Sequence, residues 1–439
     1  MTDNNANKLL SGVRVVELGM WVAGPAAAGI LADWGAEVIK IEEPGGDPMR
    51  RFFSVLSGSR EERCPPFDLY NRGKKSLMLD INQPDGRDLV ERLIANADVF
   101  VTNMRPKFLE RVRLDPETLV EKYPRLVYAS LTAYGLTGPD RDAPGYDHSA
   151  FQGRTGVTDR STPPGEVPTQ LPGGMGDNVT AIATVAGILG ALHSRTATGR
   201  GQLVGTSLLR TGIYSIGMDV STRLSLGRIA STPTRSKPRN PLFNTYQAGD
   251  GKWFWLVGTE SERHWPKVLR ALELESLGDD PLFATPRDRR RNAASLLRRF
   301  ESTLSSRTRE EWAEIFRRHD VWWAPINSMD DLVSDPQAIA AGAFISIPGQ
   351  EAVPHEEFNS VASPVDFSNT PASTFIAPPA AGAHTGELLA ELGLDEAAIT
   401  TLYRRGIVGG ARQALPVAVS HTDSSKRDSL MDRRESNAG

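Results

Sequence analysis

The sequence contains little cysteine and no excess of charge of either sign. Its 439 residues include one cysteine, Cys64, which cannot form an intrachain disulfide and is compatible with a reducing compartment. Because Cys64 lies between the charged residues 60–63 and two prolines, we expect a solvated, incidental thiol rather than a nucleophile. The net charge of -4 gives no electrostatic reason to expect a nucleic acid or an acidic membrane as a partner.

Long apolar segments and targeting signals are also missing. The longest apolar run, residues 180–192, is shorter than the ~18 residues that a membrane span needs. The first ten residues, MTDNNANKLL, have neither the basic start nor the apolar centre of a signal peptide. We therefore expect a soluble, cytoplasmic protein that does not enter a membrane.

The patterns of metal and nucleotide sites are absent as well. The seven histidines are scattered without a His-x-x-x-His pair, so no metal site is expected. The phosphate-binding pattern Gly-x-x-x-x-Gly-Lys-Ser/Thr does not occur. Residues 19–24 stand where a dinucleotide fingerprint would be, but lack its glycines. Glu42 or Glu43 could hold a ribose hydroxyl, so an NAD enzyme is an alternative that the missing glycines disfavour.

Alternating strand and helix patterns fill residues 1–225, which we interpret as one large domain. Strands are predicted at 13–18, 38–42, 75–80, 99–103, 126–131 and 202–207, with helices at 26–34, 85–96, 178–195 and 208–224 and another ending at 119–123. Such alternation predicts an open, parallel α/β sheet with helices on its faces. Ligands bind such sheets at the carboxyl ends of the strands, where the loops 20–24, 103–106 and 133–138 belong. Residues 139–176 are predicted to form a long loop.

The rest of the chain predicts a second, smaller domain and a return segment. A linker at 231–238 precedes strands at 245–246 and 253–257 and helices at 260–271, 292–305 and 309–319. We interpret residues 226–330 as a small α+β domain. Residues 331–408, with helices at 385–392 and 396–405, return to the large domain, and residues 409–439 form a disordered tail. The arginine runs at 287–291 and 298–299 indicate a solvated helical face rather than a nucleic-acid patch.

The segment Gly173-Gly174-Met175-Gly176-Asp177-Asn178 is the most informative local pattern, and it allows two interpretations. Aspartate is a favoured helix N-cap, and the glycines can simply form the turn before it. Alternatively, the positive end of the helix dipole keeps Asp177 ionised and ready to attack a carbonyl carbon. His148, next to Asp147, is either a general base or a surface histidine.

These residues resemble the class III CoA-transferases, a family that includes formyl-CoA transferase, crotonobetainyl-CoA:carnitine CoA-transferase and, as a branch, α-methylacyl-CoA racemase. The similarity runs from about residue 10 to residue 408. It is carried by residues 12–25 and 31–47, by 71–77, 97–103, 134–139 and 145–147, by Gly176-Asp177, and by 198–202, 240–243 and 383–408.

The resemblance implies a fold and a mechanism. It implies a Rossmann-like large domain and a small domain in a homodimer of interlocked chains. It further implies that Asp177 attacks an acyl thioester, forms a mixed anhydride and then an aspartyl-CoA thioester, with Gly176, Tyr146 and Asp147 in support. No tightly bound cofactor is expected; acyl-CoA and a carboxylic acid are the substrates. CoA binding carries over to Trp21, Val22, Ala23, Leu79, Ile81, Asn103, Met104 and Arg111.

Departures from the family pattern define the alternatives. Racemases have histidine where this chain has Tyr146, although His148 keeps a 2-methylacyl-CoA racemase or isomerase open as a second hypothesis. A non-catalytic acyl-CoA-binding protein is a third, and the intact Gly176-Asp177 pair opposes it. Glu43 stands where formyl-CoA transferase has a basic residue, and the tetraglycine loop of that enzyme has no counterpart here. Oxalate and formate are therefore poor substrate candidates.

Overall fold

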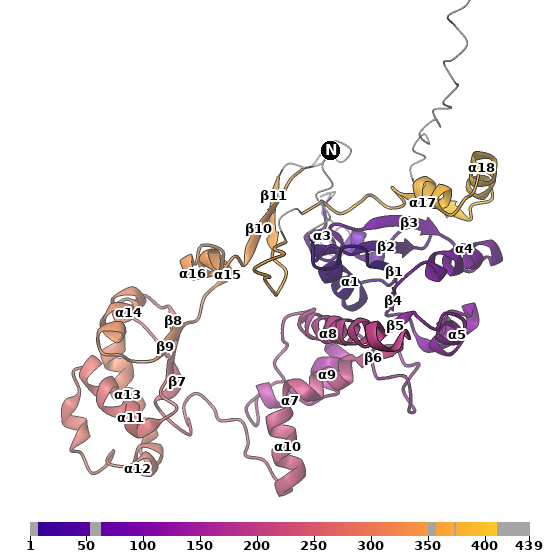
Figure 1. The fold of residues 1–439 in the computed structure, drawn as a ribbon. Coiled ribbons are helices and arrows are strands. Elements are labelled where there is room, and N and C mark those ends of the chain that lie inside the picture. Colours follow the sequence, from indigo (N-terminus) through magenta and orange to yellow (C-terminus); the bar gives the residue numbers. More distant parts are fainter. Residues whose placement is uncertain (1–7, 53–62, 350–356, 373–374, 411–439) are drawn as a thin grey trace, which may run out of the picture.

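The computed structural model describes residues 8–52, 63–349, 357–372 and 375–410. Figure 1 shows two separate lobes joined by two connecting segments. Of the described residues, 8–52, 63–226 and 375–410 form the large lobe, and 243–325 form the small lobe. The predicted disordered tail, residues 409–439, lies outside the described residues from 411 onward, but its first residue, Gly409, belongs to a strand and was wrongly assigned to the tail.

A seven-stranded sheet forms the centre of the large lobe. Its strand order is β12-β3-β2-β1-β4-β5-β6, and every neighbouring pair is parallel except β12 with β3. The predicted open parallel sheet is thus confirmed, with one short antiparallel strand added. The strands are β1 (Arg14–Leu18), β2 (Glu37–Glu42), β3 (Lys75–Leu79), β4 (Val99–Thr102), β5 (Val127–Thr132), β6 (Leu203–Ser207) and β12 (Val408–Gly409).

The sheet separates two hydrophobic cores, because successive strand residues point to opposite faces. Val15 packs between the sheet and the helices α1 (Ala23–Asp33) and α8 (Met175–Thr198). Val16 packs on the other face. The helices that contribute to that second core are α4 (Pro84–Ala95), α5 (Pro106–Val112), α6 (Pro116–Lys122), α17 (Thr385–Glu391) and α18 (Glu396–Arg404).

The strand order reverses at β1, which places a ligand crevice next to it. From β1 the chain moves outward to β2 and β3, then crosses back to β4, β5 and β6 on the other side. The loops after β1 and β4 therefore leave the sheet in diverging directions at its carboxyl edge, where open α/β sheets bind ligands. Helix α3 (Pro65–Asn71) packs on α1 near this edge, and a methyl group on Gly29 would lie 2.7 Å from the Tyr70 carbonyl oxygen.

Helix α8 is longer than predicted. Its 24 residues are long and apolar enough, by length and composition, to cross a membrane. In the fold it contacts α1, β5, β6, α9 (Leu208–Ser215) and η2, a π-helix at Asp147–Gly153. Ala181, Val185, Ile188 and Ala191 of α8 are buried in the large lobe, whereas Ile182 is 45% exposed.

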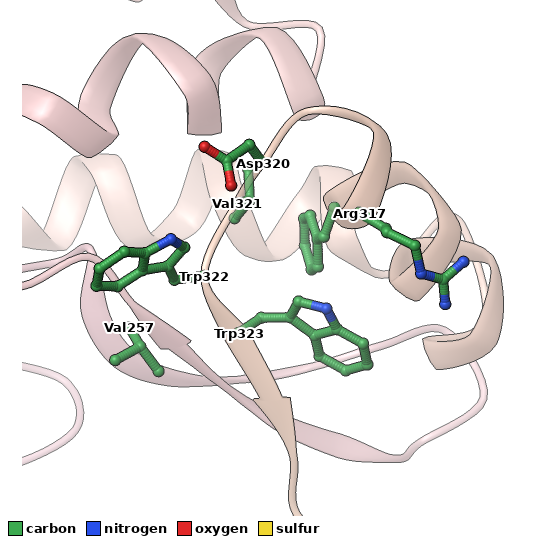
Figure 2. Close-up of a pocket in the computed structure, with 7 residues that line it drawn as sticks. Val257, Arg317, Asp320, Val321, Trp322 and Trp323 are labelled. Atoms are coloured by element: carbon green, nitrogen blue, oxygen red, sulfur yellow. The ribbon is translucent and has the colours of Figure 1, made fainter.

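The small lobe is built on a three-stranded antiparallel sheet. Its strands are β7 (Phe243–Gln247), β8 (Trp253–Val257) and β9 (Trp323–Pro325), of which β9 was not predicted. Helices α11 (Ser261–Ala271), α12 (Pro286–Arg291), α13 (Ala293–Leu304) and α14 (Arg309–Arg318) surround them. Where α14 leads into β9, a pocket of about 530 Å³ is lined by Val257, Phe316, Arg317, Asp320, Val321, Trp322 and Trp323. In Figure 2 the rings of Trp322 and Trp323 lie on opposite sides of the chain.

The structure differs from the sequence prediction in three stretches. Residues 139–176 contain η2 and the short helix α7 (Val157–Ser161), and the single helix predicted at 208–224 is divided at Ile216 into α9 and α10 (Gly217–Leu226). The return segment contains α15 (Met329–Val333), α16 (Pro336–Ala340) and the hairpin of β10 (Phe344–Ile347) and β11 (Phe358–Val361). The domain boundaries near 225 and 330 stay predictions.

Candidate active site

The first turn of α8 carries Asp177. The helix begins at Met175, and its N-cap is Gly174, whose φ of 80° lies in the left-handed region that glycine tolerates. Asp177 is therefore the third residue of the helix. The interpretation of Asp177 as the N-cap is wrong, since Gly174 occupies that position.

A second carboxylate, that of Asp147, holds this turn in place. Asp147 is 3% exposed, and its Oδ1 accepts a hydrogen bond from the backbone N–H of Gly176 at 3.0 Å. Its Oδ2 accepts one from Gln152 Nε2, also at 3.0 Å. Asp147 is the first residue of the π-helix η2, and π-helical turns are frequent at functional sites. The segment 145–153 is thus tied to the helix end that carries Asp177.

Gly176 permits this close approach. A methyl group at this position would lie 2.2 Å from Asp147 Oδ1 and 2.2 Å from Phe151 Cγ. Protein interiors are too densely packed to absorb such an overlap, so any side chain here would push α8 away from η2. Asp177 therefore keeps its position only while residue 176 is glycine.

The electrostatics of Asp177 differ from the expectation that it stays ionised. Burial, and then the neighbouring carboxylate of Asp147, raise the pKa of Asp177 to about 7. Ionisation of this carboxyl group is consequently less favourable in the folded protein than the sequence interpretation assumes. A like charge and partial removal from water outweigh the positive end of the helix dipole. The ionised form is a stronger base and a stronger nucleophile for the same reason.

Tyr70 is a further residue at this helix end, and no sequence pattern pointed to it. Its hydroxyl lies 3.7 Å from the place that a Cβ on Gly174 would take, and it forms a hydrogen bond with the Asn178 side chain. Burial raises the pKa of Tyr70, although the bond to Asn178 opposes this effect. The phenol is thus a neutral hydrogen-bond donor beside Asp177. Only the packing of α3 against α1 in the folded chain brings Tyr70 to this position.

Trp21, in the loop after β1, has an unusual backbone conformation. Its φ of 64° lies in the left-handed region that residues other than glycine rarely adopt. Its backbone N–H donates a hydrogen bond to Asp47 Oδ1 at 3.2 Å. Its ring meets those of Tyr146 and Phe52 edge to face, with centroids 6.3 and 6.2 Å apart. Strained residues cluster at functional sites, and here the strain occurs where the first loop meets the Gly-Tyr-Asp triplet.

Asn103 fixes the same loop from β4. Its side-chain amide donates to the Met20 carbonyl oxygen at 2.8 Å and accepts from the Met20 N–H at 3.0 Å. Methyl groups on Gly19 or Gly24 would each lie 3.0 Å from the Asn103 side chain. Asn103 is therefore wedged between the two glycines, and it shapes the crevice edge.

The other predicted CoA-binding residues divide into two groups. Met104 is partly buried, and Arg111 is exposed with Nη2 3.4 Å from Asn82 Oδ1, so both lie at the carboxyl edge of the sheet. Leu79 and Ile81 are completely buried in the core. Their side chains are therefore not available to a ligand, so CoA binding at these two positions would involve backbone atoms and stays a prediction.

Glu42 and Cys64 lie where their predicted roles do not fit, whereas His148 agrees with one of its two interpretations, that of a surface histidine. Glu42 accepts hydrogen bonds from Arg50 and Ser76 inside the lobe, so it is not available for a ribose hydroxyl. Cys64 is 5% exposed and packs against other apolar side chains, so the expectation of a solvated thiol is wrong. His148 is exposed, and its Nε2 lies 3.2 Å from Gln170 Nε2.

The arrangement around Asp177 suits a reaction that forms an acyl link to a carboxylate. Among the described residues, no group of three or more histidine, cysteine, aspartate or glutamate side chains could hold a metal ion. What the site offers is a half-buried carboxylate at a helix N-terminus, beside a crevice at the carboxyl edge of an α/β sheet.

Comparison with known proteins identifies the family. The sequence profile described as CoA-transferase family III matches residues 10–385. The chain is 32% identical over 404 residues to (R)-2-hydroxy-4-methylpentanoate CoA-transferase of Clostridioides difficile, covering 91% of this chain and 99% of the relative. It is 33% identical over 407 residues to cinnamoyl-CoA:phenyllactate CoA-transferase of Clostridium sporogenes, covering 92% and 97%.

A solved structure agrees with this result. The crystal structure of a CAIB/BAIF family protein from Brucella suis has a TM-score of 0.77 and 30% identity, covering 88% of this chain and 100% of that one. The chain belongs to CoA-transferase family III and is a CoA-transferase. The predicted family and enzyme class are confirmed.

Proposed function

We propose that this enzyme moves CoA between an acyl-CoA and a free carboxylic acid through covalent intermediates on Asp177. The observation that carries the proposal is the position of the Asp177 carboxylate on the first turn of α8. Its pKa is raised, and the hydrogen bond from the Gly176 N–H to Asp147 fixes the turn that carries it. A carboxylate that is desolvated yet still ionisable near neutral pH is suited to attack a thioester carbonyl.

The reaction has four balanced transfers. An Asp177 oxygen attacks the thioester carbonyl and expels CoA thiolate, which leaves a mixed anhydride. The thiolate attacks the aspartyl carbonyl and releases the donor acid, which leaves an aspartyl-CoA thioester. The acceptor carboxylate attacks that thioester and expels the thiolate again. The thiolate finally attacks the acyl carbonyl of the second anhydride, which releases the new acyl-CoA and the free Asp177 carboxylate.

The residues around Asp177 would stabilise the charge that develops in each step. Each attack places negative charge on a carbonyl oxygen, and a helix N-terminus favours such charge. The Tyr70 hydroxyl, held by Asn178, is a neutral donor at the same end of α8. Asp147 keeps the turn rigid and holds Gly176 against η2. Trp21, Val22, Ala23, Asn103, Met104 and Arg111 would border the bound CoA. The substrates of such a reaction are consistent with a cytoplasmic enzyme.

Isotope exchange separates this function from racemisation. In D₂O, the enzyme should exchange ¹³C-labelled carboxylic acid into the matching acyl-CoA while the α-carbon of a 2-methylacyl-CoA gains no deuterium. The reason is that Tyr146 provides no imidazole beside Asp177, and the His148 ring faces Gln170. Mass spectrometry reads both labels in one sample. Deuterium uptake without carboxylate exchange would favour the racemase.

We further propose that the protein is a homodimer with interlocked chains. Two segments connect the lobes: residues 227–242 contain no helix or strand, and residues 326–343 contain the short helices α15 and α16 (Figure 1). Helix α10 has no buried residue, and Tyr214, Met218 and Leu224 on α9 and α10 are 80–88% exposed. An apolar surface of this kind supports a subunit interface.

Interlocked chains should remain dimeric on dilution to nanomolar concentration, because they cannot separate without unfolding. Mass photometry of the full-length protein measures this directly. A reversible appearance of folded monomer over that concentration range would contradict interlocking.

A further inference from the structure

We propose that the transferred acids are monocarboxylic acids with a bulky apolar, preferably aromatic, side chain, and that Trp21 and Tyr146 select this side chain. The inference rests on the proposed function and specifies its substrate class. It is built on an exposed aromatic pair beside the nucleophile and on the charges around Asp177.

The aromatic pair stands directly beside the nucleophilic turn. The rings of Trp21 and Tyr146 meet at 87° with centroids 6.3 Å apart. Tyr146 is 63% exposed, although the next residue is the buried Asp147 that binds the Gly176 N–H. A large aromatic ring left in solvent at this point offers an edge and a face to a ligand, and aromatic groups bind such surfaces well.

The pair is held in place before any substrate arrives. Asp47 Oδ1 accepts from the N–H groups of Trp21 and Met49, and its Oδ2 lies 2.8 Å from Lys40 Nζ. Behind Trp21, a small apolar cluster contains Met49, Cys64, Phe67, Val22 and Phe52. A surface fixed in advance loses little entropy on binding.

The apolar surface continues from Trp21 to the helix end. Val22 Cγ1 lies 4.0 Å from the position of a Cβ on Gly174, and the Tyr70 hydroxyl oxygen lies 3.7 Å from the same position. The surface beside Asp177 therefore includes Trp21, Val22, Tyr70 and Tyr146, with the exposed His148 next to Gly173 at its border. The only polar side-chain groups of these four aromatic and aliphatic residues are the two phenol hydroxyls and the indole N–H.

The charges around Asp177 oppose a second carboxylate on the substrate. In the described part of the chain, the charge that acts on Asp177 is that of Asp147, which is negative. The basic groups beneath the first loop are already paired: Lys40 and Lys74 with Glu17, and Arg50 with Glu42. A dicarboxylic acid would add a further negative charge in a partly buried place without a compensating cation, which is unfavourable.

The test measures self-exchange, in which each acyl-CoA is incubated with its own ¹³C-labelled acid, so that no second substrate has to be known. The acids are 3-phenylpropionate, 4-methylpentanoate, propionate and succinate. With wild-type enzyme, kcat/KM for 3-phenylpropionate should exceed that for succinate at least about tenfold, the ratio that burial of one ring side chain supports.

Variants assign the preference to the aromatic pair. Tyr146→Ala and Trp21→Ala should each lower the ratio of kcat/KM for 3-phenylpropionate to that for propionate by about tenfold. Tyr146→Phe is the matched control, because it keeps the ring and removes only the hydroxyl, and it should preserve the ratio. Circular dichroism verifies that each variant is folded, and the wild-type panel tests the proposal even where a variant is not.

The possible outcomes separate this inference from the proposed function. A wild-type preference for succinate, or a ratio that Tyr146→Ala leaves unchanged, would overturn the assigned substrate class while carboxylate exchange itself still supports the transferase. Absence of exchange with all four acids, together with absence of an acyl adduct on Asp177, would overturn both.

Discussion

Asp177→Asn should lower turnover by at least about three orders of magnitude while the enzyme still folds and binds CoA. The substitution keeps the size of the side chain but removes the attacking oxygen anion, and covalent transfer through this residue has no alternative route. The backbone that surrounds it is held independently, by the bond from the Gly176 N–H to Asp147. Steady-state exchange rates and calorimetric titration with CoA measure the two properties separately.

Trapping provides the direct evidence for the same residue. With an acyl-CoA that the wild-type enzyme accepts, hydroxylamine should convert Asp177 to a hydroxamate, visible as a mass shift on the peptide that contains it. The Asn variant is the matched control and should give no shift. Turnover of Asp177→Asn within about tenfold of wild type, a barrier difference of only ~1.4 kcal/mol, would refute the mechanism.

Asp177→Asn should also be more stable than wild type, by an amount that increases with pH. The folded-state pKa of Asp177, about 7, lies above the ordinary value of 3.8. Between these values the native state binds more protons than the unfolded state, so stability falls as pH rises through this window. Asp177→Asn removes this loss. Its Tm should therefore exceed that of wild type more at pH 8 than at pH 5.

Glu17→Gln should destabilise the fold by about 3–5 kcal/mol, the usual result of breaking a buried ion pair from one side. Glu17 is 0% exposed, with Oε1 2.9 Å from Lys40 Nζ and Oε2 2.6 Å from Lys74 Nζ. Burial alone would raise the pKa of Glu17, but the two lysines lower it. Without this carboxylate, Lys74 keeps only neutral partners, the Pro25 carbonyl oxygen and Asn71 Oδ1.

The pH dependence identifies the cause of the loss. Burial already lowers the pKa of Lys74 to about 8, and removing Glu17 takes away an interaction that raises it. The unfolded variant then binds a proton that the folded variant lacks, so its stability should recover as pH rises from 7 toward 10. Thermal unfolding at several pH values measures this. Glu91→Gln, which removes a surface partner of Lys122, is the control and should change Tm little. Equal Tm values for wild type and Glu17→Gln would show that the buried pair adds no stability.

The sequence predicts the large lobe well because its signals are local. The strand of buried valines at 15–16 and the small-residue helix after Pro25 each have a period that one segment displays by itself. The predicted parallel sheet is confirmed for the same reason. The short strand β9 and the π-helix η2 lack such periodicity, since β9 depends on its pairing with β8 and η2 on contacts with α7, α8 and α9. The interlocking of the chains stays a prediction.

The site could be predicted only in part. The glycines at 173, 174 and 176 mark the nucleophilic turn, because a helix end that approaches other backbone needs them. The raised pKa of Asp177 could not be predicted, since it depends on burial and on Asp147, a residue of another segment. The same limit applies to two further residues. Tyr70 lies at the site although no sequence pattern indicates it, and Leu79, which the resemblance assigns to CoA binding, is buried in the core. Whether a strand-end or helix residue faces the crevice or the core is decided by packing.

Strand β12 is synthesised after every other strand of the large sheet, and this order affects the nascent chain. Residues 408–409 pair with β3 and complete one edge of a sheet whose other strands end by residue 207. On the ribosome, the small lobe therefore emerges while β3 still presents an unpaired edge, and such edges invite association between nascent chains. The Thr385 hydroxyl, which bonds both the Met78 N–H and the Gly409 carbonyl oxygen, joins the last-made strand to the early one. We expect translation that stops before residue 408 to leave an aggregation-prone intermediate rather than a smaller enzyme.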